Sequence, residues 1–174
     1  PRDVAVSQFF QWKYRMKPNK KALNKYPGQG EDVSMFDFIM NPDAGLQKVT
    51  GFLNLWASEA GRMDGLFLLR YEDLKAQPEA TLRKLLDFMG TPASDAQIQE
   101  AIRFSSVENM KKMEQKKTFW LSGGRMVAKD RKNPNSYKVR KAKVGGYRDY
   151  FSDAQLDVID ALVRDRLDPF YGYR

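Results

Sequence analysis

Apolar side chains recur at intervals of three and four residues through most of this chain, which is the spacing of one face of an α-helix. The first stripe predicts a helix that Asp3 caps and that ends near Lys17, just before Pro18. Its apolar side is formed by Ala5, Phe9, Trp12 and Met16. We expect this side to face the protein core.

The same spacing predicts three further helices. Glu31–Met40 reads as a short helix that follows a polar, turn-rich connection over Lys20–Gly30. Gln47–Ala60 reads as a longer one. Pro78 suits the first turn of a third helix, which Gly90 stops. The apolar stripe of this third helix comprises Leu82, Leu85, Leu86 and Met89, which we expect to be core.

Three serines in the second half of the chain predict helix starts, because each is followed three residues later by a side chain that can complete a capping box. The pairs are Ser94 with Gln97, Ser105 with Glu108, and Ser152 with Gln155. The last pair opens a predicted helix over Asp153–Arg166, whose inward residues are Leu156, Ile159, Leu162 and Val163.

One stretch departs from the helical spacing. Leu66–Leu69 is a run of large apolar residues without alternation, which suits a strand buried on both faces. A short buried helix gives the same pattern. We predict a parallel-sheet strand at about 65–71.

The composition is that of a folded protein and excludes several kinds of site. At 174 residues with 42% hydrophobic side chains, one domain with a core is expected. The chain has no cysteine and no histidine, which excludes disulfides and leaves carboxylates as the remaining metal ligands. No apolar run reaches the length of about 18 residues that a membrane helix needs, so we expect neither a metal nor a membrane partner.

Positive charge is concentrated in one segment. Lys111–Arg148 holds thirteen Lys or Arg against two acids, a net charge of +11 in 38 residues, whereas the other residues together carry −3. Such a segment attracts polyanions or phosphorylated ligands, although most of its lysines fit an ordinary solvated surface equally well. Between Lys116 and Lys143 no spacing is sustained, and a loop of this length is expected to form a lid over a site.

A cationic cluster at the end of this segment has the chemistry of a phosphate-binding loop. Within Val139–Ser152, Arg140 offers a planar fork of donors, and Lys141 and Lys143 add mobile charges. The small Ala142 and the glycine pair after it allow backbone N–H groups to approach an anion closely. A nucleotide with two phosphates would suit such a loop.

Val139–Ser152 resembles the Arg-Lys-Gly…Gly-Asp-Trp-Lys-Asn…Phe-Thr segment of the cytosolic-type sulfotransferases, which closes their site for 3′-phosphoadenosine 5′-phosphosulfate (PAPS). The resemblance implies that Arg140, Lys141 and the amide of Ala142 hold the 3′-phosphate of PAPS. Ala142 stands where the family has glycine. Related but non-identical residues stand at Gly146, Tyr147, Arg148, Asp149 and Ser152.

Three further segments resemble parts of the same PAPS site, in the family's order. Pro1–Ser7 is similar to the end of an Arg-x-Pro-x-Asp-x-x-x-Ser motif, in which Ser7 would contact the 3′-phosphate. Leu66–Leu74 is similar to an apolar strand ending in Tyr-Glu-Asp-Leu, which implies that Tyr71 lies near the adenine. Ser105–Lys111 is similar to Thr-Ser-Phe-x-x-Met-Lys, whose counterparts around the adenine would be Ser105, Ser106, Val107 and Met110.

Val107 replaces the aromatic residue of that last motif. Because an aliphatic side chain lacks the ring surface that base stacking uses, we expect weaker stacking on the adenine here.

The resemblance covers nearly the whole chain and implies an α/β fold, namely the C-terminal portion of a P-loop-kinase-like sulfotransferase fold, mostly helical apart from the strand at 65–71. Residues 1–174 would then be a single partial domain, truncated at its N-terminus. The half that carries the phosphosulfate loop and the general-base histidine would be missing, and the chain has neither a histidine nor a Gly-x-x-x-x-Gly-Lys-Ser/Thr pattern. Apolar surface exposed in this way is expected to favour a homo-oligomer or aggregation.

The implied activity is transfer of a sulfuryl group from PAPS, as cosubstrate, to a hydroxyl or amine of a small-molecule acceptor. The family resemblance implies a cytoplasmic location and no specific nucleic-acid partner. With no catalytic residue among them, the 174 residues alone are expected to be inactive. Phe9, Phe10 and Trp12 border the acceptor pocket in the family, but we expect them to be core.

Two other functions remain open. A basic module for nucleic acid or another polyanion would use Lys111–Arg148, where Phe119, Trp120, Tyr137 and Tyr147 are interspersed among the charges. No known nucleic-acid motif accompanies them. The other alternative is a non-catalytic relative that binds a nucleotide without transferring a group.

Overall fold

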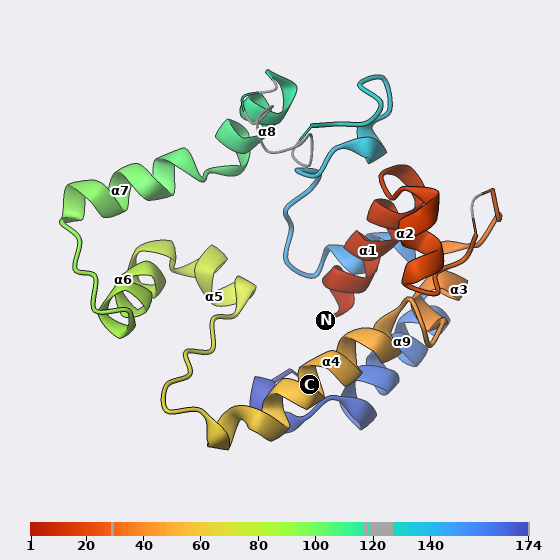
Figure 1. Ribbon diagram of the computed structural model, residues 1–174, viewed down its shortest axis with the longest axis horizontal. Helices are drawn as coiled ribbons and strands as arrows, with labels where there is room; N and C mark the ends of the chain where they lie inside the picture. Colours follow the sequence, from red (N-terminus) through yellow and green to blue (C-terminus); the bar gives the residue numbers. More distant parts are fainter. Residues whose placement is uncertain (29, 117, 119–126, 174) are drawn as a thin grey trace. The chain divides into compact units, whose positions relative to one another are not determined.

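A computed structural model describes residues 1–28, 30–116, 118 and 127–173 (Figure 1). The chain forms two compact units. The terminal unit comprises Pro1–Met63 and Gly145–Arg174, and the central unit comprises Asp64–Val144. The described residues are mostly helical and include no strand.

The terminal unit joins helices from both ends of the chain. Its elements are α1 (Arg2–Tyr14), α2 (Pro18–Leu23), α3 (Met35–Met40), α4 (Leu46–Glu59), α9 (Asp153–Arg166) and the short 3₁₀ helices η1 (Ala60–Arg62), η4 (Gly146–Tyr150) and η5 (Pro169–Tyr171). Helices α4 and α9 lie side by side (Figure 1). The Asn54 side chain joins them, because its amide donates to the Arg166 carbonyl at 2.7 Å and its oxygen accepts the Asp168 N–H at 2.9 Å.

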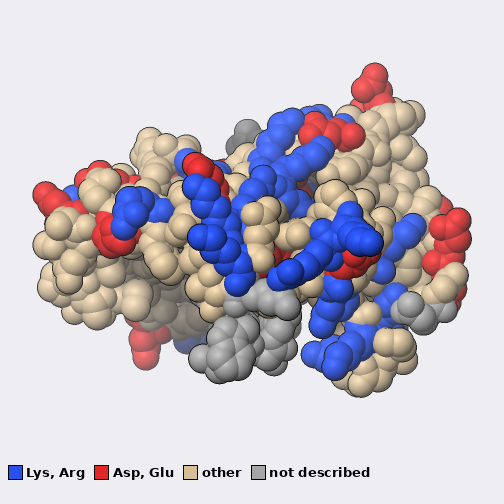
Figure 2. Space-filling view, turned by 90° about the horizontal axis from the view of Figure 1, so that it is seen from above, with Lys and Arg blue, Asp and Glu red and all other residues tan. Residues whose placement is uncertain are grey.

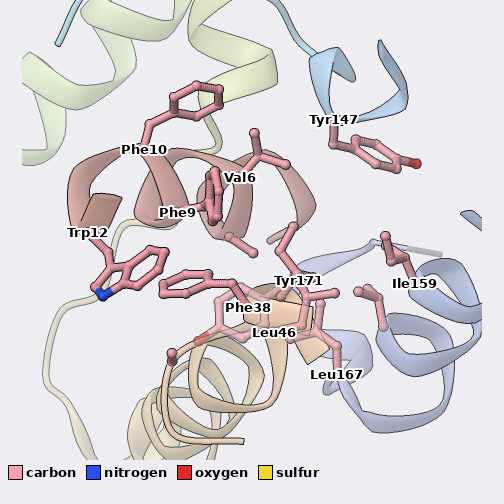
Figure 3. Close-up of a cluster of buried hydrophobic side chains, with 14 residues drawn as sticks. Val6, Phe9, Phe10, Trp12, Phe38, Leu46, Tyr147, Ile159, Leu167 and Tyr171 are labelled. Carbon is pink, nitrogen blue, oxygen red and sulfur yellow. The ribbon is translucent and has the colours of Figure 1, made fainter. Parts of the chain in front are cut away.

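Aromatic side chains from α1 and α3 form the centre of the terminal unit's core (Figure 3). The Phe38 ring is fully buried and stacks on Trp12 with their centroids 4.9 Å apart. Phe9 meets Phe38 edge to face at 5.5 Å, and the Trp12 indole N–H donates to the Pro27 carbonyl at 2.9 Å. Phe9, Phe10 and Trp12 are therefore core residues, as the sequence predicts.

The central unit is a succession of short helices. They are α5 (Tyr71–Ala76), α6 (Pro78–Phe88), α7 (Asp95–Phe104) and α8 (Val107–Gln115), followed by the 3₁₀ helix η3 (Pro134–Ser136). Each α-helix packs against the next one in the sequence. Few described side chains of this unit are buried; they are Thr81, Ile98, Met113, Glu114 and Ser136.

The capping boxes at Ser94 and Ser152 are confirmed, but the one at Ser105 is wrong. Ser105 ends α7, and its hydroxyl donates to the Ala101 carbonyl at 2.7 Å. Ser106 has the extended backbone that a cap requires, and its side chain accepts the Asn109 N–H. With two serines in sequence, the backbone angles decide which one caps.

The other helix predictions hold in type but differ in extent. Helix α1 ends at Tyr14, before the predicted end near Lys17, and Pro18 begins α2, which extends into the predicted connection over Lys20–Gly30. Proline suits the first position of a helix. Helix α3 begins only after Ser34, whose side chain accepts the Asp37 N–H at 3.1 Å. At the end of α6, Met89 is exposed instead of being core.

The strand predicted at 65–71 is not formed. Residues 65–70 are neither helix nor strand, and Tyr71 already begins α5. The backbone is extended at Met63 and Arg70, on either side of the apolar run. A strand needs a neighbour for its N–H and C=O groups, and the structure describes no other strand. Leu66, Leu68 and Leu69 are therefore exposed.

The aromatic core makes a prediction about stability. Phe38→Ala should lower the free energy of unfolding by about 3–5 kcal/mol, because it leaves a cavity between Trp12 and Phe9. Phe52→Ala on α4, where the ring is 60% exposed, should cost less than about 1 kcal/mol. Urea denaturation of both variants tests this difference. Equal losses would mean that the aromatic cluster does not hold the unit together.

Candidate functional site

The cationic loop Arg140–Ala142 lies in the central unit. Arg140 is half-buried and Lys141 is exposed. Ala142 has a φ of +49°, in the left-handed region that residues with a Cβ rarely adopt. The sequence resemblance places glycine at this position. A glycine would adopt this φ without strain, whereas Ala142 adopts it at a cost in strain.

A buried carboxylate fixes the backbone that leads into this loop. Glu114, in the last turn of α8, is 3% exposed. Its Oε1 accepts the Lys138 N–H at 2.8 Å, and its Oε2 accepts the Val139 N–H at 2.9 Å. These two hydrogen bonds attach the residues just before Arg140 to the end of α8.

The residues predicted to surround the adenine lie at the junction of α7 and α8. Ser105 ends α7, Ser106 caps α8, and Val107 is the first residue of α8. Val107 and Met110 are half-buried. They precede Glu114 by seven and four residues, so all three side chains share one face of α8. Helix α8 therefore carries candidate adenine contacts on the face that anchors the cationic loop.

The structure brings most of the predicted site residues into one unit. Tyr71, the α7–α8 junction and Arg140–Ala142 all belong to the central unit. Tyr71 is the first residue of α5 and is about half exposed. Ser7 belongs to the terminal unit, where it lies exposed in the second turn of α1.

A second carboxylate binds the backbone that follows the loop, within the terminal unit. Asp3 was expected to cap its own helix, but α1 has no side-chain cap. Its Oδ2 accepts the Gly145 N–H, and its Oδ1 the Tyr147 N–H, each at 2.8 Å. Asp3 therefore caps η4, which begins at Gly146. The expectation was wrong because it considered only local partners.

The Tyr147 side chain also helps to hold this segment of backbone in place. It is buried in the terminal core, and its hydroxyl donates to Asp160 at 3.1 Å. Burial raises the pKa of Tyr147 above its usual value of 10.0, so the phenol remains a neutral donor at physiological pH. Arg2 forms an ion pair with the same Asp160 carboxylate.

Basic side chains gather on the face that Figure 2 shows. In the central unit, the exposed ones include Lys111, Lys112, Lys116, Lys129, Arg131, Lys132, Lys138, Lys141 and Lys143. On the outer face of α8, Lys112 pairs with Glu108 at 2.7 Å, and this hydrogen bond lowers the pKa of Glu108. Phe119 and Trp120, and with them much of the predicted lid, lie outside the described residues.

Two kinds of site are not seen in the part of the chain that the structure describes. No group of three or more acidic side chains is placed to hold a metal ion there. Nor does any helix in that part have the length and apolar character to cross a membrane.

Comparison with known proteins decides the family. The sulfotransferase domain profile matches residues 1–170, which include all four motif segments. The chain belongs to the sulfotransferase family. Sulfotransferase 2A2 of Mus musculus is 24% identical over 174 residues, covering 98% of this chain and 54% of the mouse protein. Cytosolic sulfotransferase 14 of Arabidopsis thaliana is 31% identical over 120 residues, covering 66% and 32%, respectively.

A solved sulfotransferase shows the same fold. Mouse sulfotransferase SULT7A1, crystallised with PAP, superposes with a TM-score of 0.63 at 22% identity, covering 95% of this chain and 55% of that chain. The flavonol 4′-sulfotransferase of Flaveria chlorifolia is 28% identical over 120 residues, which are 66% of this chain and 36% of the plant protein. This chain thus spans between about a third and about a half of the length of these sulfotransferases.

Sequence reasoning missed the roles of both anchoring carboxylates in this sulfotransferase chain. Glu114 did carry a signal. It is one of only two acids among thirteen cations in Lys111–Arg148, and its spacing from Val107 and Met110 is that of one helical face. Asp3 gave no such signal, because its partners Gly145 and Tyr147 are more than 140 residues away in sequence.

The backbone at Ala142 makes a prediction about strain. Ala142→Gly should raise the free energy of unfolding by roughly 0.5–1 kcal/mol, because relief of the left-handed backbone exceeds the added entropy of the unfolded chain. Ala101→Gly, at an exposed position inside α7, should lower it by about 0.5–1 kcal/mol. Chemical denaturation measures both. A loss of the same size at both positions would contradict a strained turn at Ala142.

Proposed function

We propose that this chain is part of an enzyme that transfers a sulfuryl group from PAPS to a hydroxyl or amine of a small-molecule acceptor. The strongest support comes from the central unit, where Glu114 ties the loop Arg140–Ala142 to the helix that carries Val107 and Met110. A cationic loop next to a half-buried apolar helix face suits a ligand with a phosphate and a base. The family match and the crystallised relative with PAP agree with this ligand class.

The proposed contacts divide between the two ends of the nucleotide. Ser7, Arg140, Lys141 and the amide of Ala142 would hold the 3′-phosphate, and Arg140 would contribute a bidentate charge-assisted contact. The groups around the adenine would be Tyr71, Ser105, Ser106, Val107 and Met110. The donors proposed for the 3′-phosphate are either cationic or uncharged, which suits the binding of an anion. A left-handed turn such as that at Ala142 can direct backbone N–H groups toward an anion.

The reaction needs groups that this chain does not supply. An acceptor oxygen or nitrogen attacks sulfur, the bond from sulfur to the 5′-phosphate oxygen breaks, and a base takes the acceptor's proton. The 174 residues contain no histidine and no Gly-x-x-x-x-Gly-Lys-Ser/Thr loop. The residues identified here would bind and orient PAPS, so we propose that they form part of one sulfotransferase domain and are inactive by themselves.

A relative named for a flavonol acceptor, the plant flavonol 4′-sulfotransferase, supports a small-molecule acceptor. We propose a small molecule with a hydroxyl or amine group and a cytoplasmic location, as for the cytosolic relatives. No metal is needed in this scheme. Self-association through exposed apolar residues such as Leu66 and Leu68 stays a prediction.

The basic surface supports a second candidate, a general polyanion-binding module. Its exposed lysines would attract nucleic acid or another polyanion without recognising a particular nucleotide. The two functions differ in whether one arginine dominates the binding of a small ligand.

Adenosine 3′,5′-bisphosphate (PAP), the product nucleotide, separates these candidates. Arg140→Ala should weaken PAP binding by roughly 1.5–3 kcal/mol, the range for a hydrogen bond to a charged group. Lys132→Ala, at an exposed position outside the motif, should change it little. Isothermal titration calorimetry measures both constants. Equal losses in the two variants would indicate diffuse attraction and favour the polyanion-binding module.

The 174 residues alone should not catalyse sulfuryl transfer, because they contain no histidine, the side chain whose ordinary pKa suits a general base at neutral pH. Radiolabelled PAPS incubated with the purified chain and a panel of phenols, alcohols and amines tests this. Acceptor-dependent product above a heat-treated control would show that the catalytic groups lie within this chain after all.

A further inference from the structure

Both the burial of Glu114 and its position in α8 are unfavourable for an acidic side chain. It is an acidic side chain that is almost completely buried, and such side chains rarely are. It also lies in the last turn of α8, where the helix dipole is negative and disfavours a carboxylate. Packing and helix formation therefore both favour an apolar residue at this position.

The two hydrogen bonds from the cationic loop offset these costs. A carboxylate can accept from two adjacent backbone N–H groups at once, and Glu114 does so with Lys138 and Val139 at 2.8 and 2.9 Å. Glutamine could accept only one of them without turning its own N–H groups toward the other. The pair of contacts thus suits a carboxylate and sets the position of the backbone immediately before Arg140.

We propose that Glu114 is a positioning residue for the nucleotide, which holds the phosphate-binding loop Arg140–Ala142 in register with the adenine-binding face of α8. This inference rests on the proposed function. Val107, Met110 and Glu114 share that face, so the helix that would contact the base also sets the place of the loop that would contact the 3′-phosphate. Recognition of the two ends of one molecule then depends on a single carboxylate that touches neither end.

The charge of Glu114 predicts the direction in which its neutralisation changes PAP binding, and this direction can be measured. Glu114 is an anion at the base of a loop that would bind an anion, so its charge by itself opposes phosphate binding. If Glu114 acted only through charge, its neutralisation would strengthen PAP binding. If it acts by holding the loop, Glu114→Gln weakens PAP binding in spite of the more positive field.

The test compares the 174-residue chain with two single variants. Glu114→Gln is the probe, and Glu108→Gln is the matched control, an exposed acid on the same helix. Calorimetry measures PAP and adenosine 5′-monophosphate, which lacks the 3′-phosphate. Glu114→Gln should weaken PAP binding about tenfold and leave the monophosphate nearly unchanged, whereas Glu108→Gln should alter neither.

The outcomes separate the inference from the proposed function. If the unmodified chain binds PAP and Glu114→Gln binds it equally or more tightly, or loses both nucleotides in proportion, the positioning role is refuted and the function stands. If the unmodified chain binds neither nucleotide, the proposed function itself fails, and the inference fails with it.

A second measurement needs no substitution and covers the case in which Glu114→Gln does not fold. In the unmodified chain, PAP should slow hydrogen exchange at the amides of Lys138 and Val139, while the monophosphate should not. Unchanged exchange at both amides in the presence of bound PAP would overturn the proposal.

Discussion

The candidate site depends on one kind of interaction, a carboxylate that accepts two backbone N–H groups far away in the sequence. Within the central unit, Glu114 binds Lys138 and Val139, and within the terminal unit, Asp3 binds Gly145 and Tyr147. Each is a charge-assisted pair, stronger than a contact between neutral groups. The cationic loop Arg140–Ala142 contains no regular secondary structure, so the backbone that Glu114 fixes just before it takes the place of a helix or strand.

This arrangement gives a partly exposed, irregular loop a defined backbone position. The central unit has few buried apolar side chains, and its helices pack mainly against their neighbours in sequence. Hydrophobic packing alone would therefore place the loop poorly. Hydrogen bonds between a buried carboxylate and backbone groups are directional, and they define the path of the chain where the core does not.

The sequence predicted the parts of the fold that local chemistry determines. The spacing of apolar residues and the helix-capping residues predicted α4, α6, α7 and α9. The aromatic core around Trp12 was predicted from the same spacing. The failures concern contacts that local patterns do not encode. Leu66–Leu69 has the composition of a buried strand, but a strand forms only beside a partner, and the described residues provide none. Ser106 caps α8 in place of Ser105, because the backbone angles of Ser105 are those of a helix end.

The predictions of site residues divide in the same way, between local motifs and contacts distant in sequence. Arg140–Ala142 and Met110 could be predicted as site residues because their motifs are contiguous in sequence, and a glycine would suit the positive φ at Ala142. The two carboxylates that hold the neighbouring backbone were not found, because their partners lie 24 to 25 and 142 to 144 residues away. Contacts at such separations belong to the tertiary structure.

A crystal structure of this chain with PAP would test the central claim most directly. The account predicts the 3′-phosphate within hydrogen-bond distance of the Arg140 guanidinium and the Ala142 N–H, and the adenine against Val107 and Met110. The Glu114 carboxylate should remain on Lys138 and Val139, without touching the ligand. A nucleotide bound on the exposed lysine surface, or a 3′-phosphate held by other groups, would contradict it.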